Sequence, residues 1–164
     1  MTAPSTPSPI PIVRDVSALR RAVAGLRASG RPLGFVPTMG ALHDGHLSLI
    51  DAAGADDHAV VASIFVNPTQ FAAGEDLADY PRREAADVSA AAGRGAELIF
   101  APTTEAIYPA GFGTTIHVDG PTALLEGAAR PTHFDGVATV VAKLLIAVGP
   151  DRVVFGQKDA QQVA

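Results

Sequence analysis

The sequence predicts an α/β protein in which helices cover both faces of a doubly wound parallel sheet. Short apolar runs alternate with segments whose apolar residues recur at helical spacing, and this alternation is typical of a parallel sheet. The runs at 33–36 and 58–66 are nearly continuous, as expected for strands buried on both faces. We find no internal repeat, so one winding of strands and helices accounts for the chain.

Composition indicates a single soluble domain. The chain has 164 residues, 48% hydrophobic and 18% charged, enough for one full core. The net charge of −5 and the absence of any Lys/Arg cluster longer than a pair argue against nucleic acid as a partner. No cysteine is present, which excludes disulfides and thiolate metal sites. The longest apolar run is too short for a membrane span and contains Lys143, and no secretory signal precedes it, so we expect a cytoplasmic protein.

The first third of the chain is expected to contain a leader, two helices and one strand. Residues 1–11 are rich in proline, serine and threonine and predict a disordered leader before a folded domain over 12–164. A helix capped by Asp15 or Ser17 should run to about residue 28, with Gly30 ending it. The first strand, 33–36, should break at Pro37, and a second helix should follow over 46–53.

The remaining elements continue the alternation. After the strand at 58–66, we expect a loop over 75–80, a helix over 81–92 with proline at its start, a strand over 98–100, an edge strand over 114–118, a long helix over 134–148 and a buried strand over 152–155. Gly149 and Pro150 should stop the long helix.

The first candidate site follows the first strand. The run Pro37-Thr38-Met39-Gly40-Ala41-Leu42-His43-Asp44-Gly45-His46 joins this strand to a helix through a glycine-containing loop. Such a junction commonly presents backbone N–H groups to a phosphate, and both histidines lie where the helix begins. Neither a dinucleotide fingerprint nor a P-loop occurs. The alternative is one core histidine and one capping histidine without any chemistry.

The second candidate site follows the strand at 58–66. Ligands of open α/β sheets lie at the carboxyl ends of the strands, which is where Asn67 and Gln70 occur. The amide of Gln70 can donate to a carboxylate and can bind a hydroxyl through either end. The alternative is a surface loop with an Asx turn at Asn67.

The third candidate site follows the strand at 152–155. Lys158 lies at the start of a helix, where a cation is unfavourable unless an anion compensates it, although a solvated surface lysine is the alternative. Glu126 and His133 could also reach a bound substrate, and helix capping is the other interpretation for both.

Several motifs carry a resemblance to a known family. They are P-T-M-G-A-L-H-D-G-H, F-V-N-P-T-Q-F, Y-P-R, R-P-T-H-F-D-G-V and F-G-Q-K-D-A-Q-Q. In this order, from about residue 12 to the end, they resemble the pantothenate synthetases, one family of the HIGH-type nucleotidylyltransferases. The resemblance implies a Rossmann-like nucleotidylyltransferase fold. It also implies ATP-dependent condensation of (R)-pantoate with β-alanine through pantoyl adenylate, releasing AMP and pyrophosphate, in the biosynthesis of coenzyme A.

The resemblance also implies roles for individual residues. His46, with His43 beside it, and Lys158 would be catalytic, and Gln70 and Gln162 would hold pantoate. Asn67, His133 and Glu126 are added as substrate-binding candidates because of their chain positions. Mg²⁺ would accompany ATP, and Asp87 is a weak metal candidate because Ala86 replaces its expected acidic neighbour. The implied ATP-binding residues are Pro37, Thr38, Met39, Gly40, Ala41, Leu42, His43, Asp44, Gly45, His46, Gly156, Gln157, Lys158 and Asp159.

Members of the family continue beyond the point that corresponds to residue 164. We therefore expect an N-terminal domain that lacks the end of its sheet and a small C-terminal domain, with little or no turnover by itself. The resemblance implies a homodimer for the full-length protein.

Three other functions stay open. They are a different HIGH-type adenylyltransferase acting on a phosphate ester, a nucleotide-binding module without turnover, and a metal-binding protein using His43, His46 and Asp44.

Overall fold

A computed structural model of the chain contains a five-stranded, fully parallel sheet with the strand order β1-β4-β3-β2-β5. The structure describes residues 10–71, 77, 80–158 and 160–163. The strands are β1 (Ile12–Val13), β2 (Leu33–Thr38), β3 (Ala59–Ile64), β4 (Ala96–Phe100) and β5 (Arg152–Val153). The order reverses beside β2, so the sheet is doubly wound, as predicted.

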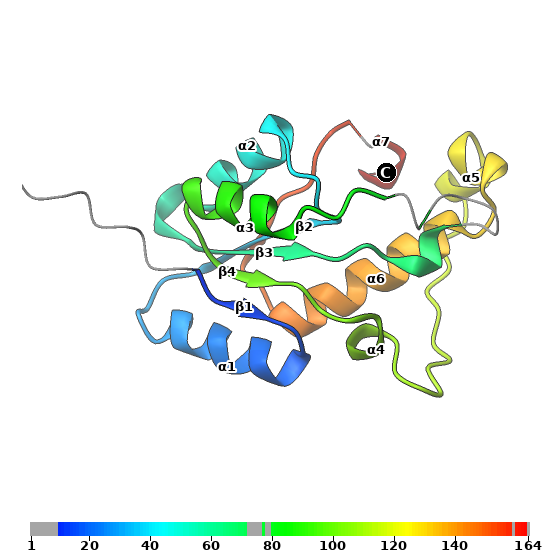
Figure 1. Cartoon of the computed structure of the whole chain (residues 1–164). Helices are drawn as coiled ribbons and strands as arrows, with labels where there is room; N and C mark the ends of the chain where they lie inside the picture. The colour runs from blue at the N-terminus through cyan, green and yellow to red at the C-terminus, as the bar shows by residue number, and fades with distance from the viewer. Residues whose placement is uncertain (1–9, 72–76, 78–79, 159, 164) are drawn as a thin grey trace, which may run out of the picture.

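Helices cover both faces of the sheet (Figure 1). On one face lie α1 (Val16–Arg27) and α6 (His133–Val148), and on the other lie α2 (Asp44–Ala53) and α3 (Glu84–Gly93). The short helices are α4 (Thr104–Ile107), α5 (Glu126–Ala129) and α7 (Ala160–Val163), and the 3₁₀ turns are η1 (Ala55–Asp57), η2 (Pro68–Gln70) and η3 (Pro121–Ala123).

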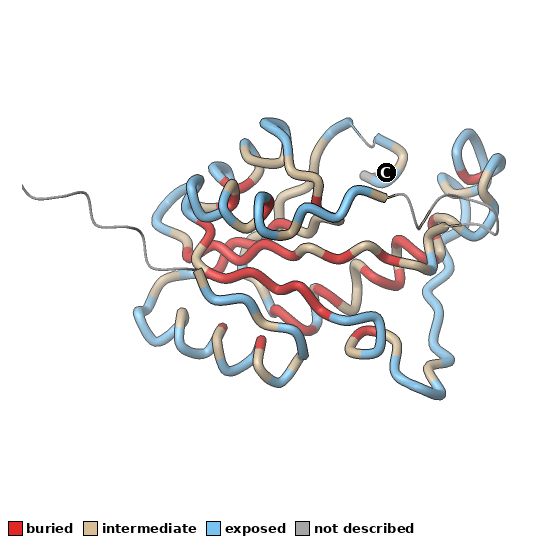
Figure 2. Tube along the Cα trace, in the orientation of Figure 1, coloured by how far each residue is buried: buried red, intermediate tan, exposed pale blue. Residues whose placement is uncertain are grey.

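The core consists of two apolar layers separated by the sheet. Successive strand residues point to opposite faces, so Phe35 packs with α1 and α6 while Val36 packs with α2 and α3. Figure 2 shows the strands as the most continuously buried part of the chain. Burial on both faces explains why the runs at 33–36 and 58–66 contain so few polar residues.

The predicted N-terminal cap of α1 and the predicted end of α6 are confirmed. Of the two candidate caps of α1, Asp15 is the one whose side chain accepts a hydrogen bond from the Ala18 N–H, at 2.8 Å. This bond is the main reason that the pKa of Asp15 lies below its ordinary value. Gly149 ends α6 with a left-handed φ of 61°, a conformation that glycine adopts without steric cost.

The prediction that the first strand breaks at Pro37 was wrong. β2 continues to Thr38, and Pro37 pairs in register with Ser63. On the side of β2 that faces β5, the Asp151 N–H donates to the Leu33 carbonyl and the Val154 N–H donates to the Phe35 carbonyl. The backbone groups of successive strand residues point to alternate sides, so Pro37, like residues 33 and 35, faces the β5 side. β5 has already ended at that level, so the missing N–H of Pro37 costs no hydrogen bond between strands.

Other element boundaries also differ from the prediction. The third helix begins at Glu84 and not at Pro81, and α2 begins two residues before His46. The buried strand predicted over 152–155 is shorter than expected: β5 has two residues, which pair with Gly34 and Phe35 and are only partly buried. β1, which pairs with β4, was not predicted. The predicted loop at 75–80 lies mostly outside the described residues.

The predicted edge strand at 114–118 is absent. This segment has no strand partner among the described residues, and the N–H of Ile116 donates instead to the hydroxyl of Thr139 on α6, at 2.9 Å. Ile10 and Pro11, assigned to the leader, contribute to the fold: Ile10 packs against the core, and the carbonyl of Pro11 accepts from Ile99. Residues 1–9 lie outside the described residues. Within the part of the chain that the structure describes, no helix is long and apolar enough to cross a bilayer.

Gly136 permits the close approach of α6 to η2. A Cβ at this position would lie 2.5 Å from the carbonyl oxygen of Thr69 and 2.8 Å from the backbone nitrogen of Gln70. Backbone atoms cannot rotate aside as a side chain can, so any larger residue would push α6 away from the end of β3.

We therefore expect Gly136→Ala to lower the free energy of unfolding by about 1–3 kcal/mol, the usual cost of overpacking. Gly25→Ala is the matched control, because Gly25 lies within α1 with no atom near its missing Cβ. The control should stabilise by about 0.5–1 kcal/mol through helix propensity. Urea unfolding of both variants measures the contrast, and equal effects would contradict the close approach.

The segment after Gly113 is held to α6 by His117. Its Nδ1 lies 2.8 Å from a carboxylate oxygen of Asp135, and its Nε2 lies 3.2 Å from one of Asp119. The pKa of His117 lies above its ordinary value, and the hydrogen bond with Asp135 is the largest cause. The protonated imidazole can donate to both carboxylates at once.

The contribution of this histidine to stability should therefore be complete below the unfolded pKa of about 6.5 and be lost as the pH rises through the higher folded pKa. NMR titration of the His117 ring measures the folded value. Asp135→Asn should lower it more than Asp119→Asn, because the contact with Asp135 is the larger cause. A His117 pKa at its ordinary value in the wild type would disprove the contact.

Candidate active site

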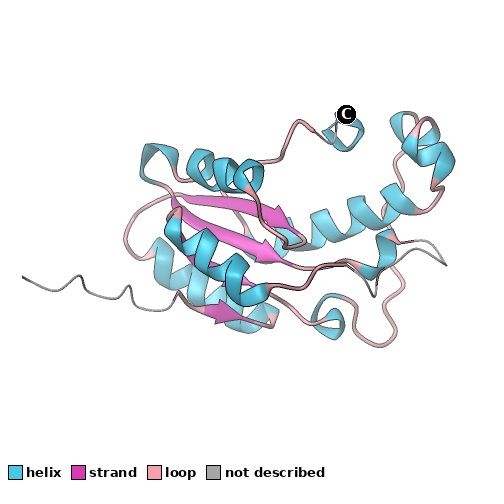
Figure 3. Ribbon diagram, turned by 45° about the horizontal axis from the view of Figure 1, so that its top comes forward, coloured by secondary structure: helices cyan, strands magenta, loops and turns pink. Residues whose placement is uncertain are grey.

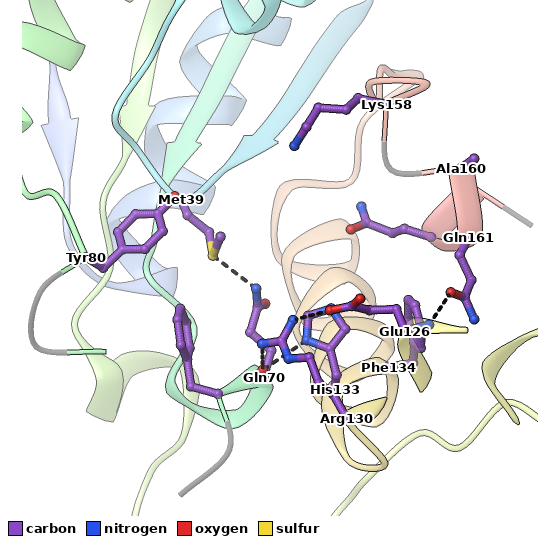
Figure 4. A pocket seen from close by; sticks show the side chains of 12 residues that line it. Met39, Gln70, Tyr80, Glu126, Arg130, His133, Phe134, Lys158, Ala160 and Gln161 are labelled. Carbon is purple, nitrogen blue, oxygen red and sulfur yellow. Dashed lines mark hydrogen bonds and ion pairs between the residues drawn. The ribbon is translucent and has the colours of Figure 1, made fainter. Parts of the chain in front are cut away.

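The predicted site segments meet at one edge of the sheet. The strands are parallel, so the segments that follow β2, β3 and β5 emerge on the same side, which Figure 3 shows as the side that also carries α5 and α7. A cavity of about 520 Å³ lies there (Figure 4). We call it the outer cavity, and its lining residues are Met39, Gln70, Phe71, Tyr80, Glu126, Arg130, His133, Phe134, Lys158, Ala160, Gln161 and Gln162.

A smaller hollow of about 140 Å³, the inner pocket, lies against α6. It shares Met39, Gln70 and Gln162 with the outer cavity. Its other lining residues are mostly apolar: Pro37, Thr38, His46, Phe65, Asn67, Val137, Val140, Val141, Leu144 and Phe155. The inner pocket therefore combines an apolar wall with three carboxamides and one imidazole.

Asp87 holds the loop that precedes the histidines. Gly40 and Ala41 both have left-handed φ values, 90° and 52°, which turn successive N–H groups to one side. The buried carboxylate of Asp87 accepts from Ala41 N–H at 2.9 Å and from Leu42 N–H at 2.8 Å. These two N–H groups are therefore bound to a carboxylate of the protein itself. From sequence alone Asp87 was only a weak metal candidate, whereas its contacts are those of a loop anchor.

The two histidines have different environments. His43 is exposed and is the N-cap of α2, because its Nδ1 accepts from the Gly45 N–H at 3.1 Å. Its Nδ1 therefore carries no proton in this arrangement, and its Nε2 is the nitrogen left for a ligand. His46 lies one turn along and lines the inner pocket, and the two ring centroids are 4.2 Å apart. The capping alternative thus applies to His43.

Asn67 is nearly inaccessible, at 1% exposure, and its side chain is engaged with the protein. The Asx alternative is present, because its Oδ1 accepts from the Thr69 N–H at 3.3 Å. Its Nδ2 donates to the Gly136 carbonyl and to Oε1 of Gln70, each at 3.1 Å. Asn67 lines the inner pocket, but its amide is bonded within the protein, so it supports Gln70 more than it offers a free group.

Gln70 is held at its backbone as well as at its side chain. Its carbonyl accepts from Arg130 and lies 3.0 Å from Nδ1 of His133, which therefore carries the proton in the neutral ring. The Gln70 Nε2 lies 3.1 Å from the Met39 sulfur. His133, predicted as a substrate contact, lines the outer cavity and at the same time fixes Gln70.

The outer side of the cavity is built by α5 and α7. Glu126 lines the cavity and its carboxylate pairs with Arg130 at 3.1 Å. Its backbone N–H donates to Oε1 of Gln161, whose Nε2 donates to the carbonyls of Pro121 and Leu124. Figure 4 shows Lys158 on the side of the cavity away from His133 and Arg130. Gln162 is exposed and lies between the two hollows.

Some predicted ATP-binding residues line neither hollow. These are Gly40, Ala41, Leu42, His43, Asp44, Gly45, Gly156 and Gln157, whereas Asp159 lies outside the described residues. Their role toward ATP stays a prediction. Sequence reasoning missed Arg130, Gln161, Tyr80 and Tyr108. Arg130, Tyr80 and Gln161 occur inside the motifs R-P-T-H-F-D-G-V, Y-P-R and F-G-Q-K-D-A-Q-Q, but nothing in the sequence signals that Tyr108 contacts the site elements.

The fold and the histidine loop define the class of protein. A doubly wound parallel sheet, with the sequence H-D-G-H at the start of the helix after β2 and a lysine beyond β5, is the HIGH-type nucleotidylyltransferase arrangement. Within this class the chain belongs to the pantoate-beta-alanine ligase family, whose sequence model matches residues 11–164.

Individual relatives agree with this assignment. The pantothenate synthetase of Ruegeria pomeroyi is 56% identical over 153 residues, covering 93% of this chain and 54% of the relative. A crystal structure of pantothenate synthetase from Thermus thermophilus matches with a TM-score of 0.86 at 50% identity, covering 94% of this chain and 54% of that one. The pantoate-beta-alanine ligase of Francisella tularensis matches with a TM-score of 0.88 at 39% identity, covering 94% and 59%. The chain thus spans about half the length of these relatives.

The contacts of Asp87 predict a loss of stability on its removal. Asp87→Ala would leave two N–H groups without an acceptor and should lower the free energy of unfolding by about 2–4 kcal/mol. Asp44→Ala, which removes an exposed carboxylate at the start of α2, is the control and should cost under about 1 kcal/mol. Urea unfolding and the backbone amide resonances of residues 39–43 report both effects. Normal stability of Asp87→Ala, together with loss of Mg²⁺ binding, would instead favour the metal role.

Proposed function

We propose that this chain is the nucleotide- and pantoate-binding part of an enzyme that condenses (R)-pantoate with β-alanine at the expense of ATP. The observation that supports it most directly is the inner pocket, where Gln70 and Gln162 lie beside an apolar wall and next to His46. Pantoate has a branched apolar centre between a carboxylate and hydroxyl groups, and its size suits a hollow of about 140 Å³.

The reaction needs no nucleophile from the protein. A carboxylate oxygen of pantoate attacks the α-phosphorus of ATP, the bond to the bridging oxygen breaks, and pyrophosphate leaves. The amine of β-alanine then attacks the acyl carbon of pantoyl adenylate, loses a proton and displaces AMP. Phosphoryl transfer of this kind depends mainly on positioning and on charge stabilisation, which His46, His43 and Lys158 would supply as donors.

ATP would occupy the outer cavity between the histidine loop and the segment after β5. The Francisella tularensis relative was crystallised with Beta-gamma ATP and β-alanine, which supports both ligands for this chain. Mg²⁺ would neutralise the polyphosphate. Among the residues that the structure describes, no group of three or more His, Cys, Asp or Glu side chains could hold a metal ion. Mg²⁺ would therefore bind together with the polyphosphate of ATP and not at a cluster of these side chains.

The other candidate functions make different predictions. An adenylyltransferase acting on a phosphate ester would need cations at the inner pocket, where the described lining residues include no lysine or arginine. A metal-binding protein would bind Zn²⁺ through His43 and His46, and a binding module would take ATP without pantoate. Calorimetric titration of this chain with ATP, pantoate and Zn²⁺ separates these functions.

We expect binding of ATP and of pantoate and no specific binding of Zn²⁺. Gln70→Ala and Gln162→Ala should each weaken pantoate binding more than ATP binding, by roughly 5- to 20-fold for the loss of one hydrogen bond to a charged ligand. Ser48→Ala, whose exposed hydroxyl donates to the Gly45 carbonyl, is the control and should leave both affinities unchanged. A fall in ATP affinity with unchanged pantoate affinity would show that the two ligands have been assigned to the wrong hollows.

Catalysis has to be tested in a longer protein. In a chimera that joins residues 1–164 to the remaining segment of the Ruegeria pomeroyi relative, His46→Ala should lower adenylate formation by roughly 10²-fold, as loss of a transition-state donor does. Pyrophosphate release measures this step directly. Near-normal release from the variant would remove His46 from the mechanism.

A further inference from the structure

The orientation of the Asn67 carboxamide is determined by neighbours whose hydrogen-bonding roles are fixed. The Thr69 backbone N–H can only donate, and it lies 3.3 Å from one side-chain atom of Asn67. The Gly136 carbonyl can only accept, and it lies 3.1 Å from the other. The first atom must therefore be the oxygen and the second the nitrogen, so no exchange of the two satisfies both neighbours.

This orientation determines that of Gln70. One N–H of Asn67 is used by Gly136, and the other points to Gln70 at 3.1 Å, so the facing atom of Gln70 must be its oxygen. The NH₂ group of Gln70 is then directed to the opposite side, where the Met39 sulfur lies at 3.1 Å. Thioether sulfur is a weak acceptor, so a ligand oxygen can replace it at little cost. Gln70 thus offers the pocket a donor and not an acceptor.

Tyr108 is the third member of this chain of bonds. Its hydroxyl lies 2.7 Å from Oδ1 of Asn67 and 3.1 Å from the hydroxyl of Thr69, which itself lies 2.9 Å from the same Oδ1. The ring packs with Phe65 and Phe112, at centroid distances of 6.4 and 5.1 Å. The Lys143 ammonium lies 4.0 Å from the Phe112 centroid and 5.6 Å from that of Tyr108. Burial raises the pKa of Tyr108, which keeps the hydroxyl protonated.

We propose that Tyr108 is a positioning residue for pantoate: by donating to Oδ1 of Asn67, its hydroxyl reinforces the orientation that Thr69 and Gly136 set and so helps to hold the Gln70 carboxamide with its NH₂ group towards the inner pocket. Tyr108 lines neither hollow, so it acts through the residues it contacts, of which Asn67 is the one that donates to Gln70. The group that binds Gln70 must accept a hydrogen bond, as a carboxylate or hydroxyl oxygen does. This inference rests on the proposed function only for the identity of the ligand, because the chain of bonds exists within the protein itself.

The test is Tyr108→Phe in the 164-residue chain, which removes one hydroxyl and keeps the ring. We expect the dissociation constant for pantoate to rise roughly 3- to 10-fold, the effect of one lost hydrogen bond to a neutral partner, and that for ATP to change less than twofold. In the free protein, the side-chain NH₂ resonances of Asn67 and Gln70, assigned with Asn67→Asp and Gln70→Glu, should shift in the ¹⁵N spectrum.

Phe112→Leu is the matched control, because it removes an aromatic contact of Tyr108 and keeps the hydroxyl. It should lower the midpoint of thermal unfolding without the selective loss of pantoate affinity. Unshifted NH₂ resonances in Tyr108→Phe would overturn the proposal. Equal losses of ATP and pantoate affinity, matching those of Phe112→Leu, would overturn it as well. If the wild type binds no pantoate, the proposed function fails while the resonance shifts still decide the role of Tyr108.

Discussion

The contact between η2 and α6 is the constraint on which the site depends. Gly136 lets the backbone of α6 meet Thr69, and its carbonyl accepts from the buried amide of Asn67. Because the same amide also binds Gln70, the packing of one helix against one turn fixes both the wall of the inner pocket and its polar group. A larger residue at position 136 would move α6 away from η2, even though position 136 lines neither hollow.

A second constraint holds the opposite side of the site. The loop after β2 contains two left-handed residues, and Asp87 stabilises it by accepting from the two amides that this turn exposes. A carboxylate on α3 thereby fixes the direction in which Met39 and the start of α2 emerge. Met39 contacts Gln70 across the cavity, so the loop held by Asp87 and the turn held by Gly136 meet at one sulfur–amide contact.

The role of each polar side chain at the site follows from its exposure to solvent. Asn67 is buried and is used in support, whereas Gln162 is exposed and His46 is partly buried beside the pocket. A buried amide costs free energy unless its donors and acceptors are bound, and Asn67 meets this requirement with partners from η2 and α6 and with the hydroxyl of Tyr108. The polar network is therefore a condition of folding, quite apart from the ligand that we propose for the pocket.

The sequence alone determined the class of fold. The continuous apolar runs could be accommodated only by strands covered on both faces, and the helical periods between them required a parallel winding. It also located Gln70, His46 and Lys158, because strand ends of a parallel sheet share one edge. Element boundaries were predicted less well at prolines, because proline is compatible with more than one local structure. Proline ends many strands, yet Pro37 lies within β2, where it faces the space beyond the end of β5. Proline is common at the start of a helix, yet Pro81 precedes α3 by three residues.

Tertiary structure alone decided how these residues are used. Asp87 appeared in the sequence as an acidic residue of a helix, and only the fold brings it to the amides of residues 41 and 42. Tyr108 and Asn67 are 41 positions apart, and no local pattern indicates their contact. Hydrogen-bond partners of buried side chains are set by the relative placement of distant elements, whereas sequence periodicity records only which side of each element faces the core.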